Sequence, residues 1–335
     1  MNLSQKTLLT GIKPTGTPHI GNYFGAIKPA IELVQNFEQS FLFIADYHAL
    51  NSVQDGARLH DLTYKLAATW LACGLDPSKT IMYRQSSVPE VFELETILNA
   101  ITPKGWMNKA HAYKAMLEAN EAEGRDRDDG VNMGLYTYPI LMAADILLYN
   151  ANLVPVGKDQ LQHIEIARDI AQRFNHTYKS EAFILPEGYV QEELESIPGT
   201  DGRKMSKSYG NVIPLFGTDD EWKKAVNRIP TDSTPIEAPK DLSHCVIFDV
   251  FKGVAPADKT AAMKAKLEAG GTGWGEVKAE LLAVLHEQLD DYRKNYNDLM
   301  NRPDDIEQVL NDGAAKAAAI AKEHMTEVRR VIGAR

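Results

Sequence analysis

The sequence predicts an α/β fold, a doubly wound parallel sheet joined to a smaller all-helical domain. Three observations lead to this prediction. In the first half of the chain, short apolar runs typical of buried strands alternate with segments of helical periodicity. Beyond about residue 211 the strand pattern stops and only helical patterns follow. The length of 335 residues also exceeds the size at which one hydrophobic core usually suffices.

The composition is ordinary for a globular protein, with 44% apolar and 24% charged residues. The net charge of −10 excludes a protein that coats nucleic acid nonspecifically, so DNA is not an expected partner. The two cysteines, Cys73 and Cys245, are far apart and in no ligand spacing, which favours a reducing, cytoplasmic location. No apolar stretch approaches the roughly 20 residues that span a bilayer, so no membrane association is expected.

The first half contains four apolar runs that predict strands, at residues 6–11, 41–45, 79–84 and 152–156. Segments with helical spacing lie between and after them, at residues 19–37, 57–73, 91–100, 104–119, 138–149 and 157–174. Residues 118–130 are densely charged and predict either a solvent-exposed loop or a flap over a site. In the last third we expect helices at residues 219–228, 276–300 and 304–332, with a proline-rich linker at residues 230–239.

A turn at residues 12–18 connects the first strand to a helix that opens at His19. A helix N-terminus offers free N–H groups and a positive dipole, so this junction is suited to binding phosphate. The small residues Gly21 and Gly25 would let a nucleotide base lie close to the helix backbone. The junction therefore predicts a nucleotide site at the edge of the sheet.

A second basic stretch, residues 202–211, has Lys204 and Lys207 between glycines at both ends. Glycine permits positive φ, so we expect a mobile loop rather than a helix. Two lysines on such a loop are suited to closing over a polyphosphate. A solvated basic surface loop is the alternative interpretation.

The helix predicted at residues 138–149 is apolar all round and hence buried, with Pro139 in its first turn. Asp145 lies in its middle, where an unpaired carboxylate is costly. Asp145 is either a structural aspartate bonded to another group or an acceptor in a ligand pocket. Tyr138 lies two turns earlier on the same face.

Asp159 and Gln160 follow the strand at residues 152–156, at the edge where open α/β sheets bind ligands. His163 and Glu165 follow on the same predicted helix. No third ligand of suitable type stands nearby, so no metal site formed by protein ligands is expected.

These features resemble a known family closely. Residues 18–22 (PHIGN) and 204–208 (KMSKS) are similar to the two signatures of class I aminoacyl-tRNA synthetases. Asparagine replaces the last histidine of the first signature, a variant of the tryptophanyl branch. Residues 137–160, the following residues 163–165 and the ending at residues 311–316 also resemble that branch.

The resemblance implies a Rossmann-like fold with a catalytic domain at residues 1–195, completed by a C-terminal helix at residues 303–335. Residues 196–302 would form the KMSKS loop and a helical anticodon-binding domain. The family is homodimeric and uses ATP with Mg²⁺ bound through the ATP phosphates. It activates L-tryptophan to tryptophanyl-adenylate and then charges tRNA(Trp).

The resemblance also implies roles for individual residues. His19 and Asn22 would bind ATP phosphates, and Lys204 and Lys207 would hold the departing pyrophosphate. Further ATP contacts would come from Lys13, Gly21, Lys114, Gly157, Asp159, Met205 and Ser206. Asp145 would accept the indole N–H of tryptophan. Four more residues would line the tryptophan pocket: Tyr138 and Gln160 at the α-amino group, His48, and Met142, where the tyrosyl branch has glutamine.

Three alternatives stay open at the level of the sequence. A tyrosyl-tRNA synthetase would use the same chemistry on another amino acid. A small-molecule nucleotidyltransferase would share the first signature but would not need the helical last third. A non-catalytic, RNA-binding paralogue would not need the two lysines, His19 and Asp145. Because the lysine loop lies at the expected seam between the domains, loop closure and domain rotation are expected to be one motion.

Overall fold

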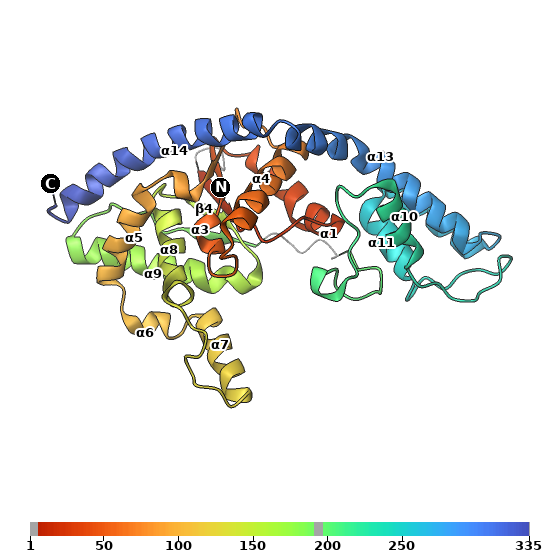
Figure 1. Cartoon of the computed structure of the whole chain (residues 1–335), viewed down its shortest axis with the longest axis horizontal. Helices are drawn as coiled ribbons and strands as arrows, with labels where there is room; N and C mark the ends of the chain where they lie inside the picture. Colours follow the sequence, from red (N-terminus) through yellow and green to blue (C-terminus); the bar gives the residue numbers. More distant parts are fainter. Residues whose placement is uncertain (1–5, 191–196, 335) are drawn as a thin grey trace.

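The computed structural model describes residues 6–190 and 197–334 (Figure 1). A five-stranded sheet has the order β3-β2-β1-β4-β5, and all its strand pairs are parallel. The strands are β1 (Thr7–Ile12), β2 (Gln39–Ile44), β3 (Thr80–Arg84), β4 (Leu153–Pro155) and β5 (Glu187–Tyr189). From β1 the chain adds β2 and β3 on one side, and later β4 and β5 on the other. This confirms the predicted doubly wound sheet and places its switch point between β1 and β4, where such sheets bind ligands.

The three strands on one side of the switch point were predicted from their apolar runs, and they lie within about two residues of the expected bounds. Consecutive residues Leu8 and Leu9 of β1 are both buried, as expected of a strand with helices on both faces. The edge strand β5 was missed because its three residues are Glu, Gly and Tyr, all exposed. A run this short and polar has no strand periodicity.

Most of the helices around the sheet confirm the predicted segments. They are α1 (Ile20–Asn22), η2 (Tyr23–Ile27), α2 (Lys28–Val34), α3 (Asp46–Ala49), α4 (Gly56–Ala72), η3 (Gln85–Ser87), α5 (Glu90–Ile101), α6 (Lys104–Met107), α7 (His111–Ala122), α8 (Met133–Leu147), η4 (Lys158–Gln160) and α9 (Leu161–Tyr178).

The helix expected at residues 19–37 is interrupted by a π-helical turn over Tyr23–Ile27, where the N–H of Lys28 bonds the carbonyl of Tyr23. Pro29 follows directly and has no N–H to donate to the carbonyl four residues earlier. The wider turn therefore sits where the regular helical ladder would lose a hydrogen bond.

The expectation of one helix over residues 104–119 was wrong, because α6 and α7 are separated at Asn108–Ala110. Gln162 of α9 explains the break. Its side chain accepts from the N–H of His111 at 2.8 Å and donates to the carbonyl of Lys109 at 3.0 Å. These bonds replace helical ones, and α7 then projects from the body of the protein (Figure 1). The charged stretch begins as helix and is exposed throughout residues 121–130, as expected of a surface loop.

Pro139 was expected in the first turn of its helix, but it does not lie there. Helix α8 begins six residues earlier at Met133, where the side chain of Asn132 caps it by accepting from the N–H of Leu135 at 2.8 Å. Pro139 therefore lies in the helix interior, where it leaves one helical hydrogen bond unmade.

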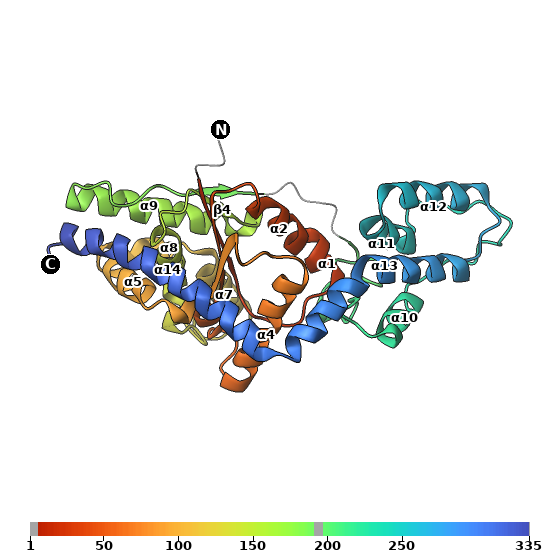
Figure 2. The ribbon, with the colours of Figure 1, turned by 90° about the horizontal axis from the view of Figure 1, so that it is seen from above.

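The rest of the chain is helical, as predicted. Its elements are η5 (Lys207–Tyr209), α10 (Asp219–Asn227), α11 (Val246–Val254), α12 (Ala257–Ala269), α13 (Trp274–Met300) and α14 (Pro303–Val331). Figure 2 shows α11 and α12 on one side of α13 and α10 on the other. Helix α14 returns to the sheet and packs on β3 so closely that a Cβ on Gly313 would lie 1.7 Å from the carbonyl oxygen of Met82. The boundary expected near residue 195 falls outside the described residues.

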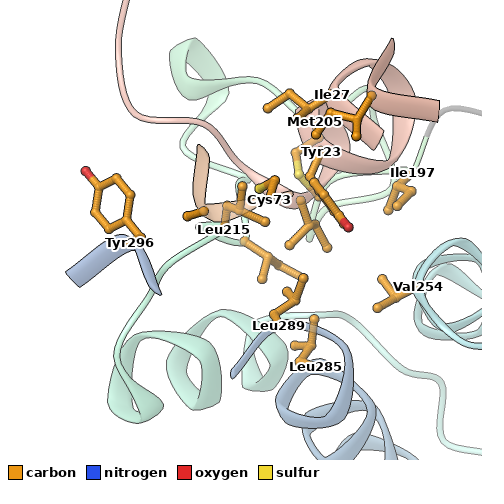
Figure 3. Packing of buried hydrophobic residues seen from close by; sticks show 14 of the residues in the cluster. Tyr23, Ile27, Cys73, Ile197, Met205, Leu215, Val254, Leu285, Leu289 and Tyr296 are labelled. Carbon is orange, nitrogen blue, oxygen red and sulfur yellow. The ribbon is translucent and has the colours of Figure 1, made fainter. Parts of the chain in front are cut away.

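One hydrophobic cluster runs from the sheet into the helical part (Figure 3). It contains Leu8 of β1, Met205 of the lysine loop and Leu289 of α13. The two parts therefore share a packed core at their seam. No described helix is both long and apolar enough to cross a membrane. Cys73 and Cys245 are buried free thiols.

Candidate active site

The first signature forms the start of α1 and is closed by a reciprocal cap. The Nδ1 atom of His19 accepts from the N–H of Asn22 at 3.2 Å, and the Oδ1 atom of Asn22 accepts from the N–H of His19 at 3.1 Å. The acceptor role of Nδ1 places the proton of a neutral His19 on Nε2. His19 and Asn22 thus keep an imidazole N–H and an amide NH₂ as donors for a ligand.

His19 is neutral at physiological pH. Burial, and then the nearby charge of Lys207, lowers the pKa of its imidazole to about 4. The side chain can therefore offer a neutral hydrogen-bond donor, and the positive charge beside it comes from Lys207.

Lys207 reaches back over the first loop. A Cβ built on Gly16 would lie 2.5 Å from the Nζ atom of Lys207, so the ammonium group lies directly against the Gly16 backbone. Partial burial lowers the pKa of the Lys207 ammonium. The two signatures, nearly 190 residues apart along the chain, therefore meet in space.

The lysine loop is held by Asn211, which sequence reasoning did not single out. Its side chain accepts from the N–H of Ser206 at 2.8 Å and donates to the carbonyl of Lys204 at 3.1 Å and to Asp201 at 2.7 Å. The side chain of Met205 is buried, with its sulfur 3.4 Å from the Cβ position of Gly21. The expectation of a loop without helix was wrong for Lys207–Tyr209, which form one 3-10 turn ended by Gly210 at φ 64°.

Lys204 faces a different space from Lys207. It lines a cavity of about 970 Å³ between the first signature helix and α11. Its walls include Phe24, Gly25, Lys28, Arg203, Lys204 and Lys252. Gly25 has no atom within 4 Å of its Cβ position, as expected of a helix face left open for a ligand. Gly21, in contrast, is already covered by His19 and Met205.

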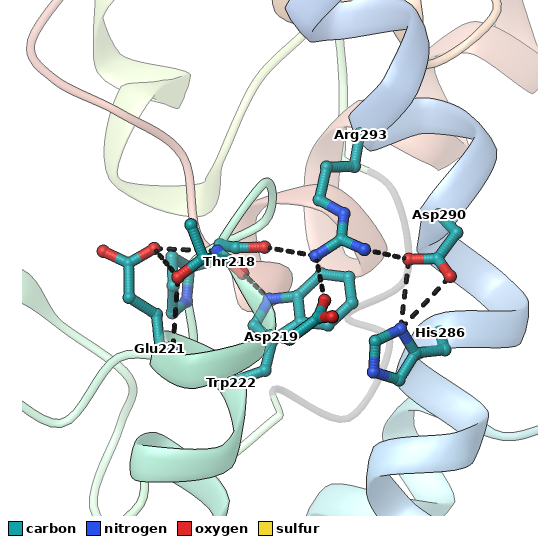
Figure 4. A network of polar contacts seen from close by, with 9 residues as sticks. Thr218, Asp219, Glu221, Trp222, His286, Asp290 and Arg293 are labelled. Carbon is teal, nitrogen blue, oxygen red and sulfur yellow. Dashed lines mark hydrogen bonds and ion pairs between the residues drawn. The ribbon is translucent and has the colours of Figure 1, made fainter.

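The first signature is bonded to residues 213–217, a strap that follows the lysine loop along the chain. The N–H of Ile20 donates to the carbonyl of Ile213 at 3.0 Å, and the N–H of Leu215 donates to that of Pro18 at 3.2 Å. The indole N–H of Trp222 on α10 donates to the carbonyl of Pro214 at 2.8 Å (Figure 4). The helical part is thereby bonded to the strand-like segment that holds His19.

Arg293 of α13 stabilises this junction. Its guanidinium lies 4.5 Å from the ring centre of Trp222 and donates to the carbonyl of Gly217 at 2.9 Å (Figure 4). It also bonds Asp219 and Asp290, each at 2.7 Å. A cation stacked on an aromatic face and satisfied by several acceptors is a strong anchor.

Asp145 is buried, with 2% of its surface exposed, and its carboxylate is bonded by two side chains. Nε2 of His48 lies 2.9 Å from Oδ2, and the amide of Gln85 donates to Oδ1 at 2.9 Å and to Oδ2 at 3.0 Å. Burial raises the pKa of Asp145, while the bonds from His48 and Gln85 lower it. Asp145 is thus a paired aspartate, as the structural interpretation expects, and its partners come from the carboxyl ends of β2 and β3.

Tyr138, on the same helix as Asp145, contacts His163 of α9 through its hydroxyl group and the Nε2 atom of the imidazole. The two rings meet edge to face at 4.9 Å between centres. Burial, and then the charge of Asp159, raises the pKa of Tyr138 to about 12. Burial, followed by the charge of His111, lowers the pKa of His163 to about 4, so both groups are neutral.

The remaining predicted residues lie around this pair or apart from it. Gln160 donates to Asp159 at 2.9 Å, and Oδ1 of Asp159 lies 2.6 Å from the Cβ position of Gly157, so these residues form one compact turn. Met142 is half-buried on α8, between Tyr138 and Asp145 on one face. The charge of Lys13 contributes to the lowered pKa of His163. Lys114 is exposed on the projecting helix α7.

Two residues around Asp145 and Tyr138 were missed in the sequence, in addition to Asn211 of the lysine loop. Gln85 has no titratable group and no periodic pattern, although its place directly after a predicted strand is a signal. His163 was considered only as a metal ligand. Within residues 6–190 and 197–334, no group of three or more His, Cys, Asp or Glu side chains could hold a metal ion.

A protein-family model described as tRNA synthetases class I (W and Y) matches residues 1–290. The chain belongs to this family. A tryptophan–tRNA ligase of Neisseria meningitidis is 50% identical over 335 residues, which cover 99% of each chain. One of Pseudomonas aeruginosa is 49% identical, covering 98% of this chain and 74% of the relative.

Among solved structures, the tryptophanyl-tRNA synthetase of Campylobacter jejuni, complexed with ADP and tryptophan, superimposes with a TM-score of 0.89. It is 43% identical and covers 98% of this chain and 99% of its own. The resemblance to class I synthetases that the two signatures indicate is thus confirmed over nearly the whole chain.

Proposed function

We propose that this class I synthetase activates L-tryptophan with ATP, forming tryptophanyl-adenylate and pyrophosphate, and then transfers tryptophan to the 3′ adenosine of tRNA(Trp). The observation that carries the proposal is the approach of Lys207 to the loop at Gly16 and His19. The buried Asp145 carboxylate, bonded by His48 and Gln85, supports it. The full-length similarity to tryptophan–tRNA ligases supports the choice of amino acid and of tRNA.

ATP would bind with its phosphates at the start of α1. His19 and Asn22 supply neutral donors there, and Lys207 supplies the charge. The open helix face at Gly25 and the cavity beyond it are suited to the rest of the nucleotide, with Lys204 on its wall. Of the other predicted ATP contacts, Met205 and Ser206 belong to the docked loop, and Gly157 and Asp159 to the turn after β4. Lys13 lies within electrostatic reach of the site, and Lys114 would reach it only from α7.

Mg²⁺ would enter with ATP, bound to its phosphate oxygens, and would add charge neutralisation there. This chain's own contribution is to position the phosphates and to place Lys207 beside them. A carboxylate oxygen of tryptophan attacks the α-phosphorus in line, the bond to the bridging oxygen breaks, and pyrophosphate leaves with its electron pair. Lys207, and Lys204 if the loop moves, would stabilise the charge that develops on this leaving group.

The tryptophan side chain would lie against α8. Asp145 would accept the indole N–H, with His48 and Met142 as walls of the pocket. Tyr138 and Gln160 would hold the α-amino group. Phenylalanine would leave the buried carboxylate without a ring donor, and such polar rejection can reach roughly 10⁴–10⁵.

The helical segment at residues 196–302 is the proposed anticodon-binding domain, and residues 1–195 with 303–335 the catalytic domain. Helix α14 fits this division because it packs on β3.

We also infer a homodimer in the cytoplasm. Leu50 and Met133 are 44% and 70% exposed, and they lie on adjacent segments because Asn51 abuts Gly134. Light scattering after size-exclusion chromatography tests the dimer: a mass near 37.2 kDa would contradict it.

ATP–pyrophosphate exchange with each of the twenty amino acids tests the activity. We expect exchange with tryptophan, and then charging of tRNA(Trp) by the same protein. Exchange with tyrosine alone would contradict the choice of substrate. Exchange with tryptophan but no tRNA charging would indicate a nucleotidyltransferase, and no exchange with any amino acid would indicate a binding protein.

A further inference from the structure

We propose that Gln85 is a positioning residue for substrate specificity: it holds the Asp145 carboxylate so that Oδ1 is the atom that accepts the ring N–H of the amino acid. The inference rests on the proposed function of Asp145 and adds to it a second residue and a specific acceptor atom.

The side chain of Gln85 is fixed in one orientation. It begins the 3-10 turn η3 directly after β3 and is 1% exposed. Its Oε1 atom accepts from the N–H of His48 at 3.4 Å, and its Nε2 atom donates to both oxygens of Asp145. Exchanging the amide oxygen and nitrogen would set an acceptor against the carboxylate and a donor against a backbone N–H. The hydrogen-bond partners therefore assign the amide orientation.

The two carboxylate oxygens of Asp145 differ in the number of hydrogen-bond donors that contact them. A carboxylate oxygen accepts about two hydrogen bonds. Oδ2 already has two donors, His48 at 2.9 Å and Gln85 at 3.0 Å. Oδ1 has one, Gln85 at 2.9 Å. The acceptor capacity that remains for a substrate N–H is thus on Oδ1.

The turn that carries Gln85 is itself held in place. Oδ1 of Asp46 accepts from the N–H of Ser86 at 3.0 Å and from the N–H of Tyr47 at 3.1 Å. Since Tyr47 and His48 belong to the same short helix α3, this carboxylate ties the ends of β2 and β3 together. His48 and Gln85 therefore approach Asp145 from two strands whose spacing is fixed by the sheet.

The energetics favour a functional reason for this arrangement. Burying a carboxylate, even with hydrogen-bonded partners, is often no more stabilising than an apolar residue of similar size. Its benefit is preorganisation: an acceptor held by protein donors needs no reorientation when the substrate N–H arrives. Without Gln85, Asp145 would keep one partner and its carboxylate could rotate about its terminal bond. Oδ1 would then no longer be held in position to accept the substrate N–H.

The test compares Gln85→Met with the unchanged protein in ATP–pyrophosphate exchange, using tryptophan and β-(3-benzothienyl)alanine, in which sulfur replaces the ring N–H. Met has the length of Gln but cannot donate. We expect kcat/KM for tryptophan to fall about tenfold, the magnitude of one hydrogen bond to a charged group. The value for the analogue should change less than about twofold, and the KM for ATP should stay unchanged.

Gln308→Met is the matched control, because Gln308 also donates to an aspartate, Asp312 at 2.8 Å, but on the exposed face of α14. Gln308→Met should leave kcat/KM unchanged for both tryptophan and its analogue. If Gln85→Met does not fold, as judged by circular dichroism, Gln85→Asn replaces it: the shorter amide cannot reach Asp145 and should give the same selective loss.

The outcomes separate the two proposals. Equal loss for tryptophan and its analogue, or no loss for either, would overturn the role of Gln85 while the proposed activity stands. Failure of the unchanged protein to activate tryptophan would instead overturn the proposed function. Selective loss with tryptophan supports both.

Discussion

The ammonium group of Lys207 lies against the backbone of Gly16, so close that a methyl group at Gly16 would be 2.5 Å from Nζ. Gly16 has φ 145°, a backbone conformation that only glycine adopts without strain. The contact joins the second signature to the loop just before the first, and it sets the distance between the cation and the helix start at His19. Several properties of the protein should depend on it.

Gly16→Ala should impair activation without affecting tryptophan binding. The methyl group strains the loop and displaces Lys207 from the phosphate position. Because misplacement by about 1 Å can cost about 10²-fold, we expect kcat for pyrophosphate exchange to fall roughly 10- to 100-fold. Stopped-flow kinetics and calorimetric titration with tryptophan would measure the two effects. Gly275→Ala, at an exposed glycine with open space around it, is the control and should be neutral.

Removing the charges themselves should have a larger effect. Lys207→Ala should lower the rate of adenylate formation about 10²- to 10³-fold, since it removes a group that stabilises developing charge. Lys204→Ala should have a smaller effect in the loop position seen here, because Lys204 lines the neighbouring cavity instead. Equal rates for Lys207→Ala and the unchanged protein would contradict the assigned role of the loop, and Lys264→Ala, an exposed lysine on α12, serves as the control.

The fold was predictable where the sequence pattern is local. Leu8, Leu9 and Phe41–Ile44 are consecutive apolar residues, and buried strands are their direct consequence. The break between α6 and α7 was not predictable, since it depends on Gln162, whose side chain bonds the backbone of residues more than 50 positions away. Edge strand β5 similarly exists through its pairing with β4 and not through its own side chains.

The site shows the same division. His19, Lys207 and Asp145 were singled out because glycine-rich turns, clustered lysines and a carboxylate in an apolar helix are unusual in a sequence. Gln85 and Asn211 carry no charge and follow no period, and their roles become clear only from their hydrogen bonds in the fold. The partners of Asp145 come from residues 60 and 97 positions away, a relationship that no local pattern contains.

Asp145→Asn should weaken tryptophan binding without lowering the stability of the fold. Burial raises the pKa of Asp145 in the folded state, so ionisation at neutral pH opposes folding, increasingly as the pH rises through the raised pKa. The amide removes this opposition, so the free energy of unfolding at pH 7 should be unchanged or higher. Tryptophan binding should weaken roughly 10- to 100-fold, because an amide is a poorer acceptor than a carboxylate. Urea denaturation and titration calorimetry would measure both, and a stability loss above about 2 kcal/mol would contradict the argument.

Trp222→Phe should weaken the junction between the helical part and the strap that holds His19. It removes the bond of 2.8 Å to the carbonyl of the half-buried Pro214 but keeps an aromatic ring under Arg293 (Figure 4). Losing one such hydrogen bond costs about 0.5–1.5 kcal/mol, and the thermal midpoint should fall accordingly. An unchanged midpoint in calorimetry would show that the indole N–H contributes nothing. Trp106→Phe, at a partly exposed tryptophan on α6, is the matched control.

His163 should make stability depend on pH in the acid range. Its pKa is about 4 in the folded protein and 6.5 in its reference state, so between these values the unfolded chain binds more protons and stability falls as the pH falls. At about 1.4 kcal/mol per pKa unit, this histidine alone contributes up to about 3 kcal/mol of stability at pH 7 that is lost toward pH 4. In His163→Gln, the free energy of unfolding measured between pH 6.5 and 4 should therefore decline less steeply. The slope should be smaller by the contribution of about one bound proton. His176→Gln, at an exposed histidine of the same helix, should keep the original slope, and equal slopes for both variants would contradict a neutral, buried His163.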